Sequence, residues 1–199
     1  MIFFAHRINL TEELKKVPLS LGVEIDIRSE GNKIIVTHDP FASGIELKEY
    51  LLNINERPII FNIKCEGLEH TVLDLALKYN IEQYFFLDCS FPMIQKLYND
   101  LNFKKVALRY SEYEGFETLT LMSHRADWVW IDCFHNNILT IENYVKLKSL
   151  GYKICVVSPE LHGRPEQINI FIDFFKKNKI LPDAVCAKLT YFNIWNTLL

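Results

Sequence analysis

The stretch Gly22-Val23-Glu24-Ile25-Asp26-Ile27-Arg28 alternates apolar and charged side chains with a period of two. Successive side chains of a β-strand point to opposite faces, so Glu24, Asp26 and Arg28 share one face and the three aliphatic residues share the other. From the rise per residue of a strand, the two carboxylates lie about 7 Å apart on the charged face. An ordinary sheet would place this charged face in water. We predict instead that the sheet containing this strand closes into a barrel, with both acids at its mouth. Carboxylates that leave water need a compensating positive charge, so we also expect a cation beside them.

Strand-like runs recur along the chain, and the segments between them have the apolar spacing of helices. The predicted strands lie at 2–7, 22–28 with an extension at 33–38, 57–65, 84–89, 104–110, 128–133, 153–158 and 184–188. Strict alternation of strand and helix is typical of a parallel sheet, and eight repeats favour a (β/α)8 barrel over an open sheet. No linker or low-complexity tract interrupts the pattern. We predict an α/β fold, a compact TIM barrel that forms a single domain over residues 1–199.

Capping signals mark the ends of two of the predicted helices. Asn9 followed by Glu12 resembles a capping box for a short first helix. Thr140 has the side chain of an N-cap, and Gly151 has the backbone freedom that terminates a helix. We expect one helix to begin near Asn9 and another to lie between Thr140 and Gly151.

Composition excludes several classes of protein. The apolar fraction of 49% excludes general disorder, and a net charge of -3 argues against a nucleic-acid partner. The apolar run 2–5 is too short for a signal peptide, and no stretch approaches the roughly 20 apolar residues of a membrane span. The five cysteines have no CxxC spacing, so we expect them to be reduced core residues of a cytoplasmic protein. Its oligomeric state is not predicted.

Polar residues gather at the carboxyl ends of the predicted strands, where a (β/α)8 barrel places its chemistry. They are His6-Arg7, Glu24 and Asp26, His38-Asp39, Asn62 and Lys64, Asp88 and Ser90, Arg109, Asp132, Ser158 and Glu160, and Lys188. Two histidines, two carboxylates and an arginine at neighbouring strand ends suit metal-assisted acid–base chemistry on a phosphate. Two carboxylates favour a hard ion such as Mg²⁺ or Ca²⁺, because zinc sites contain more His or Cys ligands.

Four motifs in this order resemble the glycerophosphodiester phosphodiesterase family, which acts in lipid metabolism. They are His6-Arg7, Glu24-x-Asp26, His38-Asp39 and Asn62-x-Lys64, where the family has His-Arg-Gly, Glu-x-Asp, His-Asp and Glu-x-Lys. Ser90-Phe91 is also similar to a Ser-Phe pair of the family. The resemblance implies a (β/α)8 barrel that binds one divalent cation and hydrolyses a small phosphodiester.

The resemblance also implies a role for each matching residue. His6 and His38 correspond to the general acid/base pair. Glu24, Asp26 and Asn62 occupy the positions of the metal ligands. Arg7 and Lys64 occupy the positions that hold the phosphate and stabilise the transition state. In the family, a hydroxyl of the substrate's own alcohol attacks phosphorus, the histidines exchange roles, and water opens the cyclic product.

The sequence departs from the family pattern at several points. Ile8 replaces the glycine of the first motif, and Asn62 replaces a third metal-binding glutamate. An amide oxygen coordinates Mg²⁺ or Ca²⁺ without adding charge, so we expect weaker metal binding unless a nearby acid contributes. The candidate acids are Glu66, Asp88 and Glu160. Only residues 40–56 separate the His-Asp motif from the third strand, where the family inserts a subdomain that recognises the alcohol group.

Residues after the predicted later strands have two interpretations each. Arg164 follows the seventh strand, where barrels often bind phosphate, so it is a candidate substrate ligand or a surface loop residue. Asp132 is expected either to contact substrate or to form an ion pair with Arg109 or Lys188.

Three functions are consistent with these features. The first is a metal-dependent phosphoric diester hydrolase acting on a small or unusual phosphodiester. The alternative is a degenerate barrel that binds a phosphorylated ligand without turnover, as the loss of a carboxylate at Asn62 and the short 40–56 connection suggest. A third is a lyase that stops at a cyclic phosphate.

Overall fold

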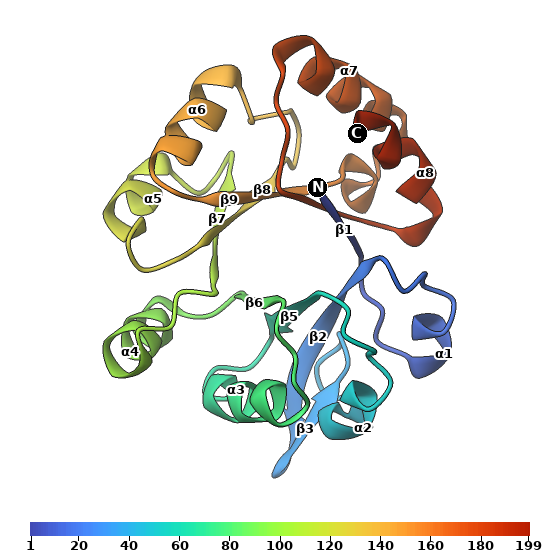
Figure 1. Ribbon diagram of the computed structural model, residues 1–199. Helices are drawn as coiled ribbons and strands as arrows, with labels where there is room; N and C mark the ends of the chain where they lie inside the picture. The colour runs from blue at the N-terminus through green and yellow to red at the C-terminus, as the bar shows by residue number, and fades with distance from the viewer. The chain divides into compact units, whose positions relative to one another are not determined.

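The computed structural model describes residues 1–199, and the chain divides into two compact units. The N-terminal unit consists of Phe4–Val106. The C-terminal unit consists of Ala107–Leu199 together with Met1–Phe3. Each unit is built from parallel strands that alternate with helices (Figure 1).

The N-terminal unit is organised around the nine-residue strand β2. Its elements are β1 (Ile2–Ala5, shared with the other unit), α1 (Thr11–Leu14), β2 (Gly22–Glu30), β3 (Lys33–Val36), β4 (Ile45–Glu46), α2 (Leu47–Leu51), β5 (Ile59–Ile63), α3 (Glu69–Lys78), β6 (Tyr84–Leu87) and α4 (Phe91–Leu101). Strand β2 is parallel to β1 and β5, and β5 is parallel to β6. Strand β2 also forms an antiparallel hairpin with β3, which pairs with β4. Helices α1, α2 and α3 lie around these strands (Figure 1).

The C-terminal unit repeats the same strand–helix alternation. Its elements are β7 (Ala107–Ser111), α5 (Phe116–Met122), β8 (Trp128–Asp132), α6 (Ile141–Ser149), β9 (Lys153–Val157), η1 (Pro159–His162), η2 (Pro165–Gln167), α7 (Ile168–Asn178), β10 (Ala184–Ala187), η3 (Leu189–Tyr191), α8 (Phe192–Trp195) and η4 (Asn196–Leu198). Strands β7, β8, β9 and β10 are parallel in that order. Helices α7 and α8 pack together, with the ring centroids of Phe175 and Trp195 6.5 Å apart (Figure 1).

All five residues of β5 and of β8 are buried, including the polar residues Asn62 and Asp132, as parallel strands covered on two sides require. The helices contribute one apolar stripe each; in α3, Val72 and Ala76 are fully buried. All five cysteines are free, as predicted, but only Cys133, Cys155 and Cys186 are buried; Cys65 and Cys89 are half-buried, so the prediction that they are core residues is wrong. None of the helices is both long enough and apolar enough to span a membrane.

The helix signals had different outcomes. The hydroxyl of Thr140 accepts a hydrogen bond from Asn143 N at 3.1 Å, and Gly151 follows α6 with φ of +86°, so both predictions are confirmed. The predicted capping box at Asn9 is wrong. The N-cap of α1 is Leu10, which makes no side-chain capping bond, because the amide of Asn9 is hydrogen-bonded to Asp26 instead.

The predicted α/β class and the eight parallel strands are confirmed. The extension predicted after the second strand is the separate strand β3, which turns back on β2. The sequence pattern did not indicate β4 and α2, which form the short connection to β5. Closure of the strands into a barrel and the single-domain organisation of residues 1–199 stay predictions.

Candidate active site

Both carboxylates of β2 are buried. The side chains of Val23, Ile25 and Ile27 are inaccessible on one face of the strand, and Glu24 and Asp26 are each only 1% exposed on the other. The prediction that these two acids leave water is therefore confirmed. Register pairs Asp26 with Asn62 on β5, which places an amide beside the acids.

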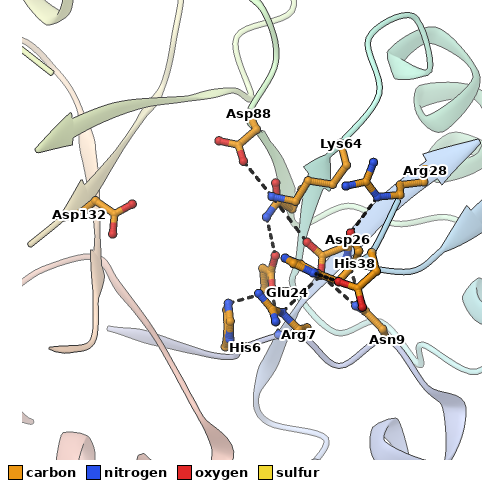
Figure 2. Close-up of polar contacts among 12 residues, drawn as sticks. His6, Arg7, Asn9, Glu24, Asp26, Arg28, His38, Lys64, Asp88 and Asp132 are labelled. Atoms are coloured by element: carbon orange, nitrogen blue, oxygen red, sulfur yellow. Dashed lines mark hydrogen bonds and ion pairs between the residues drawn. The ribbon is translucent and has the colours of Figure 1, made fainter. Parts of the chain in front are cut away.

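The segment that follows β1 binds both acids through its backbone and side chains. Arg7 has a φ of +55°, so the chain turns sharply after His6, and the backbone N–H of Arg7 donates to Glu24 Oε2 at 2.7 Å. The Asn9 amide donates to Asp26 Oδ2 at 2.8 Å. The imidazole of His6 lies 3.8 Å from Glu24 Oε2, and the guanidinium of Arg7 lies 3.8 Å from Asp26 Oδ2. Figure 2 shows these side chains grouped around the two carboxylates.

Strand β5 supplies an amide and a cation to the same acids. Asn62 Nδ2 donates to Glu24 Oε1 at 2.9 Å, whereas Asn62 Oδ1 is buried without a hydrogen-bond partner. Lys64 Nζ lies 3.7 Å from Asp26 Oδ1 and 3.0 Å from Asp88 Oδ2 (Figure 2). The lysine is thus shared between an acid of β2 and the acid that follows β6.

The β2–β3 hairpin brings His38 to the same side of the unit. Arg28 Nε donates to the backbone carbonyl of His38 at 2.8 Å, and the backbone N–H of Thr37 donates to Asp26 O at 3.0 Å. Nδ1 of His38 lies 2.7 Å from Asp39 Oδ1, and because an ionised carboxylate only accepts, Nδ1 carries the proton. That hydrogen bond lowers the pKa of Asp39. The same hydrogen bond leaves Nε2 as the ring nitrogen of His38 that does not contact Asp39.

Burial and charge perturb two groups of the site strongly. Burial, and secondly the charge on Asp26, raise the pKa of Glu24 to about 7, although the hydrogen bonds from Asn62 and Arg7 oppose the rise. Burial and the charge of Arg7 lower the pKa of His6 to about 4, and the charge of His38 acts in the same direction. Burial without a cation favours the neutral forms of both Glu24 and His6.

The oxygen donors of the site fit a hard divalent cation. Glu24 and Asp26 provide two buried carboxylates, and the unpartnered Asn62 Oδ1 provides a buried neutral oxygen that lacks any other bond. Carboxylate and amide oxygens are the ligands that Mg²⁺ and Ca²⁺ prefer. No group of three or more His, Cys, Asp or Glu side chains in the structure is arranged to hold a metal ion.

The acids proposed to compensate for Asn62 are engaged elsewhere. Glu66 accepts a hydrogen bond from the hydroxyl of Ser90, and Asp88 binds Lys64. Glu160 lies in the C-terminal unit, where it accepts hydrogen bonds from the Ser158 hydroxyl and from the Lys188 N–H. The expected weakening of metal binding at Asn62 is consequently not offset by Glu66 or Asp88 in their present positions.

The C-terminal unit holds a separate polar cluster around Asp132. This carboxylate accepts hydrogen bonds from the Arg109 guanidinium, from His162 Nε2 at 2.7 Å and from Trp130 Nε1 at 3.2 Å. The ion pair with Arg109, one of the two alternatives for Asp132, is therefore present. The guanidinium of Arg164 donates to the backbone carbonyls that follow β8, so it fastens that loop, and its role as a phosphate ligand stays a prediction.

Sequence reasoning missed three residues that contact the predicted site. Asn9 donates a hydrogen bond to the Asp26 carboxylate, and Arg28 donates one to the backbone carbonyl of His38. The Tyr50 hydroxyl donates to Ile8 O at 2.6 Å. Arg28 was visible only as the third charge on the β2 face. No local signal identifies Asn9 or Tyr50, because their partners lie far away in the sequence.

The seven residues predicted from the four sequence motifs lie close together, as expected. All seven predicted residues belong to the N-terminal unit. The carboxylates of Glu24 and Asp26 are contacted by His6, Arg7, Asn62 and Lys64. His38 directly follows Thr37, whose N–H donates to Asp26 O. Their catalytic and metal-binding roles stay predictions at this stage.

Comparison with known proteins identifies the fold. No family model and no curated protein matches the sequence. A glycerophosphodiester phosphodiesterase from Agrobacterium tumefaciens matches with a TM-score of 0.63 and 14% identity, over 94% of this chain and 96% of that one. A phosphodiesterase from Oleispira antarctica, solved with its product sn-glycerol-3-phosphate, matches with a TM-score of 0.59 and 16% identity, over 87% of this chain and 97% of that one. A glycerophosphoryl diester phosphodiesterase from Parabacteroides distasonis matches with a TM-score of 0.62 and 13% identity, over 94% of this chain and 82% of that one. The chain shares the fold of the glycerophosphodiester phosphodiesterases, as its motifs predict.

Proposed function

We propose that this protein is a phosphoric diester hydrolase of the glycerophosphodiesterase type that depends on one divalent cation, Mg²⁺ or Ca²⁺. The observation that carries the proposal is the burial of Glu24 and Asp26 beside His6, Arg7 and Lys64. Acids at 1% exposure are costly unless a positive charge compensates them. The fold shared with phosphodiesterases supports the same conclusion.

Glu24, Asp26 and Asn62 would hold the cation through oxygen atoms. When bound, the cation would neutralise charge on the phosphoryl oxygens and polarise phosphorus toward attack. The unpartnered Oδ1 of Asn62 supports its place among the ligands, since a buried polar atom without a partner is rare in a folded protein.

Arg7 and Lys64 would bind the non-bridging oxygens of the phosphodiester. The Arg7 side chain is 48% exposed, so its guanidinium is accessible to a ligand while its Nε stays near Asp26. Its fork suits two phosphoryl oxygens, and Lys64 adds a point charge. Both cations would stabilise the charge that develops during phosphoryl transfer.

His6 and His38 would move the protons. One histidine takes the proton of a hydroxyl on the substrate's own alcohol as that oxygen attacks phosphorus. The other gives a proton to the alcohol oxygen whose bond to phosphorus breaks. The two then exchange roles as water opens the cyclic phosphate. The hydrogen bond from His38 Nδ1 to Asp39 supports this role, because it fixes the tautomer that leaves Nε2 free.

The substrate would be a small phosphodiester. The chain from β3 to β5 contains only β4 and the five-residue α2, so no subdomain covers the alcohol group on this side of the unit. Glycerophosphodiesters are the first compounds to test, because the Oleispira antarctica phosphodiesterase was solved with sn-glycerol-3-phosphate. The five free cysteines support a cytoplasmic location, and we propose no nucleic-acid partner.

Phosphorus NMR tests the proposal directly. Protein dialysed against EDTA would be mixed with a panel of glycerophosphodiesters, and Mg²⁺ or Ca²⁺ then added. We expect new phosphomonoester resonances only after the metal is added. His6→Ala and His38→Ala should abolish turnover, whereas His124→Ala, which removes a histidine from a loop of the C-terminal unit, should not.

The same spectra distinguish the competing functions. Tight binding of a phosphodiester with no new resonance would support a binding protein without turnover, which the neutral side chain of Asn62 favours. Accumulation of a cyclic phosphate resonance would identify a lyase. Full turnover in EDTA would contradict the metal requirement.

A further inference from the structure

The edge of β2 that faces β1 has an unusual set of hydrogen-bond partners. Strand β1 ends at Ala5, whose register partner is Val23, while β2 continues to Glu30. Beyond Val23, the backbone groups on this edge lack a strand to pair with until β3 begins. Buried backbone groups need partners, so other atoms have to occupy this gap.

Three groups fill the gap in order along β2. The backbone N–H of Ile8 donates to Glu24 O at 2.9 Å. Asn9 Oδ1 accepts from the Asp26 N–H at 2.9 Å, and the Thr37 N–H donates to Asp26 O at 3.0 Å. The amide side chain of Asn9 thus takes the place of the β1 backbone at Asp26.

The other end of the same amide reaches the Asp26 carboxylate. Asn9 Nδ2 donates to Asp26 Oδ2 at 2.8 Å, so a single side chain fixes both the backbone and the carboxylate of Asp26 (Figure 2). The second oxygen, Oδ1, faces Lys64 at 3.7 Å, which is longer than a hydrogen bond. Because the amide is neutral, it orients the carboxylate without neutralising its charge.

The segment that carries Asn9 is itself held firmly. Asn9 is 9% exposed, and the Tyr50 hydroxyl from α2 donates to Ile8 O at 2.6 Å. The Arg7 N–H is bonded to Glu24 Oε2. The position of Asn9 is therefore set by contacts of the two residues that precede it.

We propose that Asn9 is the positioning residue of the site and that its amide holds the Asp26 carboxylate in the orientation that binds the divalent cation. The inference rests on the proposed function, because Asp26 is assigned there as a metal ligand. Partners that orient metal ligands typically contribute about 10–100-fold to metal affinity. A residue with only a structural role would lower stability without changing that affinity.

The test measures binding of Mg²⁺ and Ca²⁺ alone by isothermal titration calorimetry. We expect Asn9→Ala to weaken binding by about 10–100-fold. Asn143→Ala is the matched control: its amide donates to Tyr110 Oη and Ile138 O, both at 2.9 Å, in the C-terminal unit. The control removes two amide hydrogen bonds, as Asn9→Ala does, and should leave metal affinity unchanged.

Amide hydrogen exchange adds a readout that needs no metal. The Asp26 N–H should be protected in the wild-type protein and exchange much faster in Asn9→Ala, because Asn9 Oδ1 is its acceptor. Should Asn9→Ala fail to fold, Tyr50→Phe takes its place, since it loosens Ile8 without removing the amide. We expect it to weaken metal binding as well.

The outcomes separate the inference from the proposed function. Unchanged metal affinity in Asn9→Ala, or in Tyr50→Phe where that variant is used, overturns the positioning role and leaves the proposed function standing. A wild-type protein that binds neither ion overturns the metal-dependent function, and the role of Asn9 with it. Weakened binding together with faster exchange at Asp26 supports the inference.

Discussion

Asn62→Asp changes the donor set of the site by a single charge at nearly constant shape. In the wild-type protein, Asn62 Nδ2 donates to Glu24 Oε1 at 2.9 Å. A carboxylate oxygen placed there would face another carboxylate at the same distance. If both were ionised, the repulsion would be about 6 kcal/mol at an effective dielectric constant of about 20. That cost is too large to persist while protonation is possible.

Protonation limits the cost. The pKa of Glu24 is already raised to about 7, so the added cost comes from the new aspartate rather than from Glu24. The ordinary pKa of an aspartate is about 3.9, and holding a proton on it at pH 7 costs about 4 kcal/mol, which is the upper bound on the loss of stability in the metal-free variant. For a chain of this length, a loss of that size lowers Tm by about 8–16 °C.

A bound cation should reverse this loss, because it attracts the added carboxylate. Binding at a concentration 100 times Kd stabilises a folded protein by about 2.7 kcal/mol. We expect saturating Ca²⁺ or Mg²⁺ to raise Tm more in Asn62→Asp than in the wild-type protein, as measured by scanning calorimetry with and without metal. Asn143→Asp, which removes a half-buried amide donor from the C-terminal unit, should lose stability without gaining metal response. A metal-induced shift in Asn62→Asp no larger than that of the wild-type protein would refute the placement of residue 62 among the ligands.

Four further changes test other contacts. Tyr50→Phe and Tyr152→Phe each leave a buried backbone carbonyl unpaired, so each should lower the free energy of unfolding by about 1–3 kcal/mol, as measured in urea. Only Tyr50→Phe should also reduce activity, because Tyr152 lies in the other unit. Arg28→Met should lower kcat by releasing the backbone of His38 while leaving calorimetric metal affinity intact; an unchanged kcat would count against that role. Burial favours a higher pKa for Glu112, but hydrogen bonds from four backbone N–H groups, those of Asn136, His135, Glu112 itself and Phe134, outweigh it and lower the pKa to about 2. The stability gap between wild type and Glu112→Gln should therefore be full above pH 4.5 and vanish as pH falls through about 2. A gap that persists below pH 2 in urea unfolding would contradict this. Ca²⁺ and glycerol 3-phosphate should each tighten the binding of the other by the same factor in calorimetry, and independent binding would disprove a shared site.

The fold was predictable wherever apolar periodicity alone determined it. The period of two in 22–28 predicted the strand and the face that Glu24 and Asp26 share. Their burial, to 1% exposure, was expected instead from closure of the sheet. Repeated strand–helix units predicted the eight parallel strands. The apolar pattern predicts 33–38 as an extension of the second strand, but this segment forms a hairpin with β2. A turn at Gly31, with φ of +59°, reverses the chain without changing the apolar pattern.

The partners of the site residues were less predictable, because they depend on contacts between distant parts of the chain. Asn9 matched a capping box through Glu12, three residues away, whereas its actual partner Asp26 is 17 residues away. Arg164 matched a phosphate loop by its position after β9. Its guanidinium instead donates to the carbonyls of Cys133 and His135, whose exposure depends on how the loop after β8 folds.

Charge balance explains why an amide at position 62 is compatible with a phosphodiesterase site. The two acids of β2 face two cations, Arg7 and Lys64, and Lys64 also binds Asp88. A divalent cation added to this set leaves an excess of positive charge, which a third carboxylate would cancel. With a neutral amide at Asn62, that excess is left for the anionic phosphodiester to cancel. We therefore expect a bound phosphodiester to tighten metal binding at the proposed site, so that the weak affinity expected for the metal alone couples the cation to the substrate.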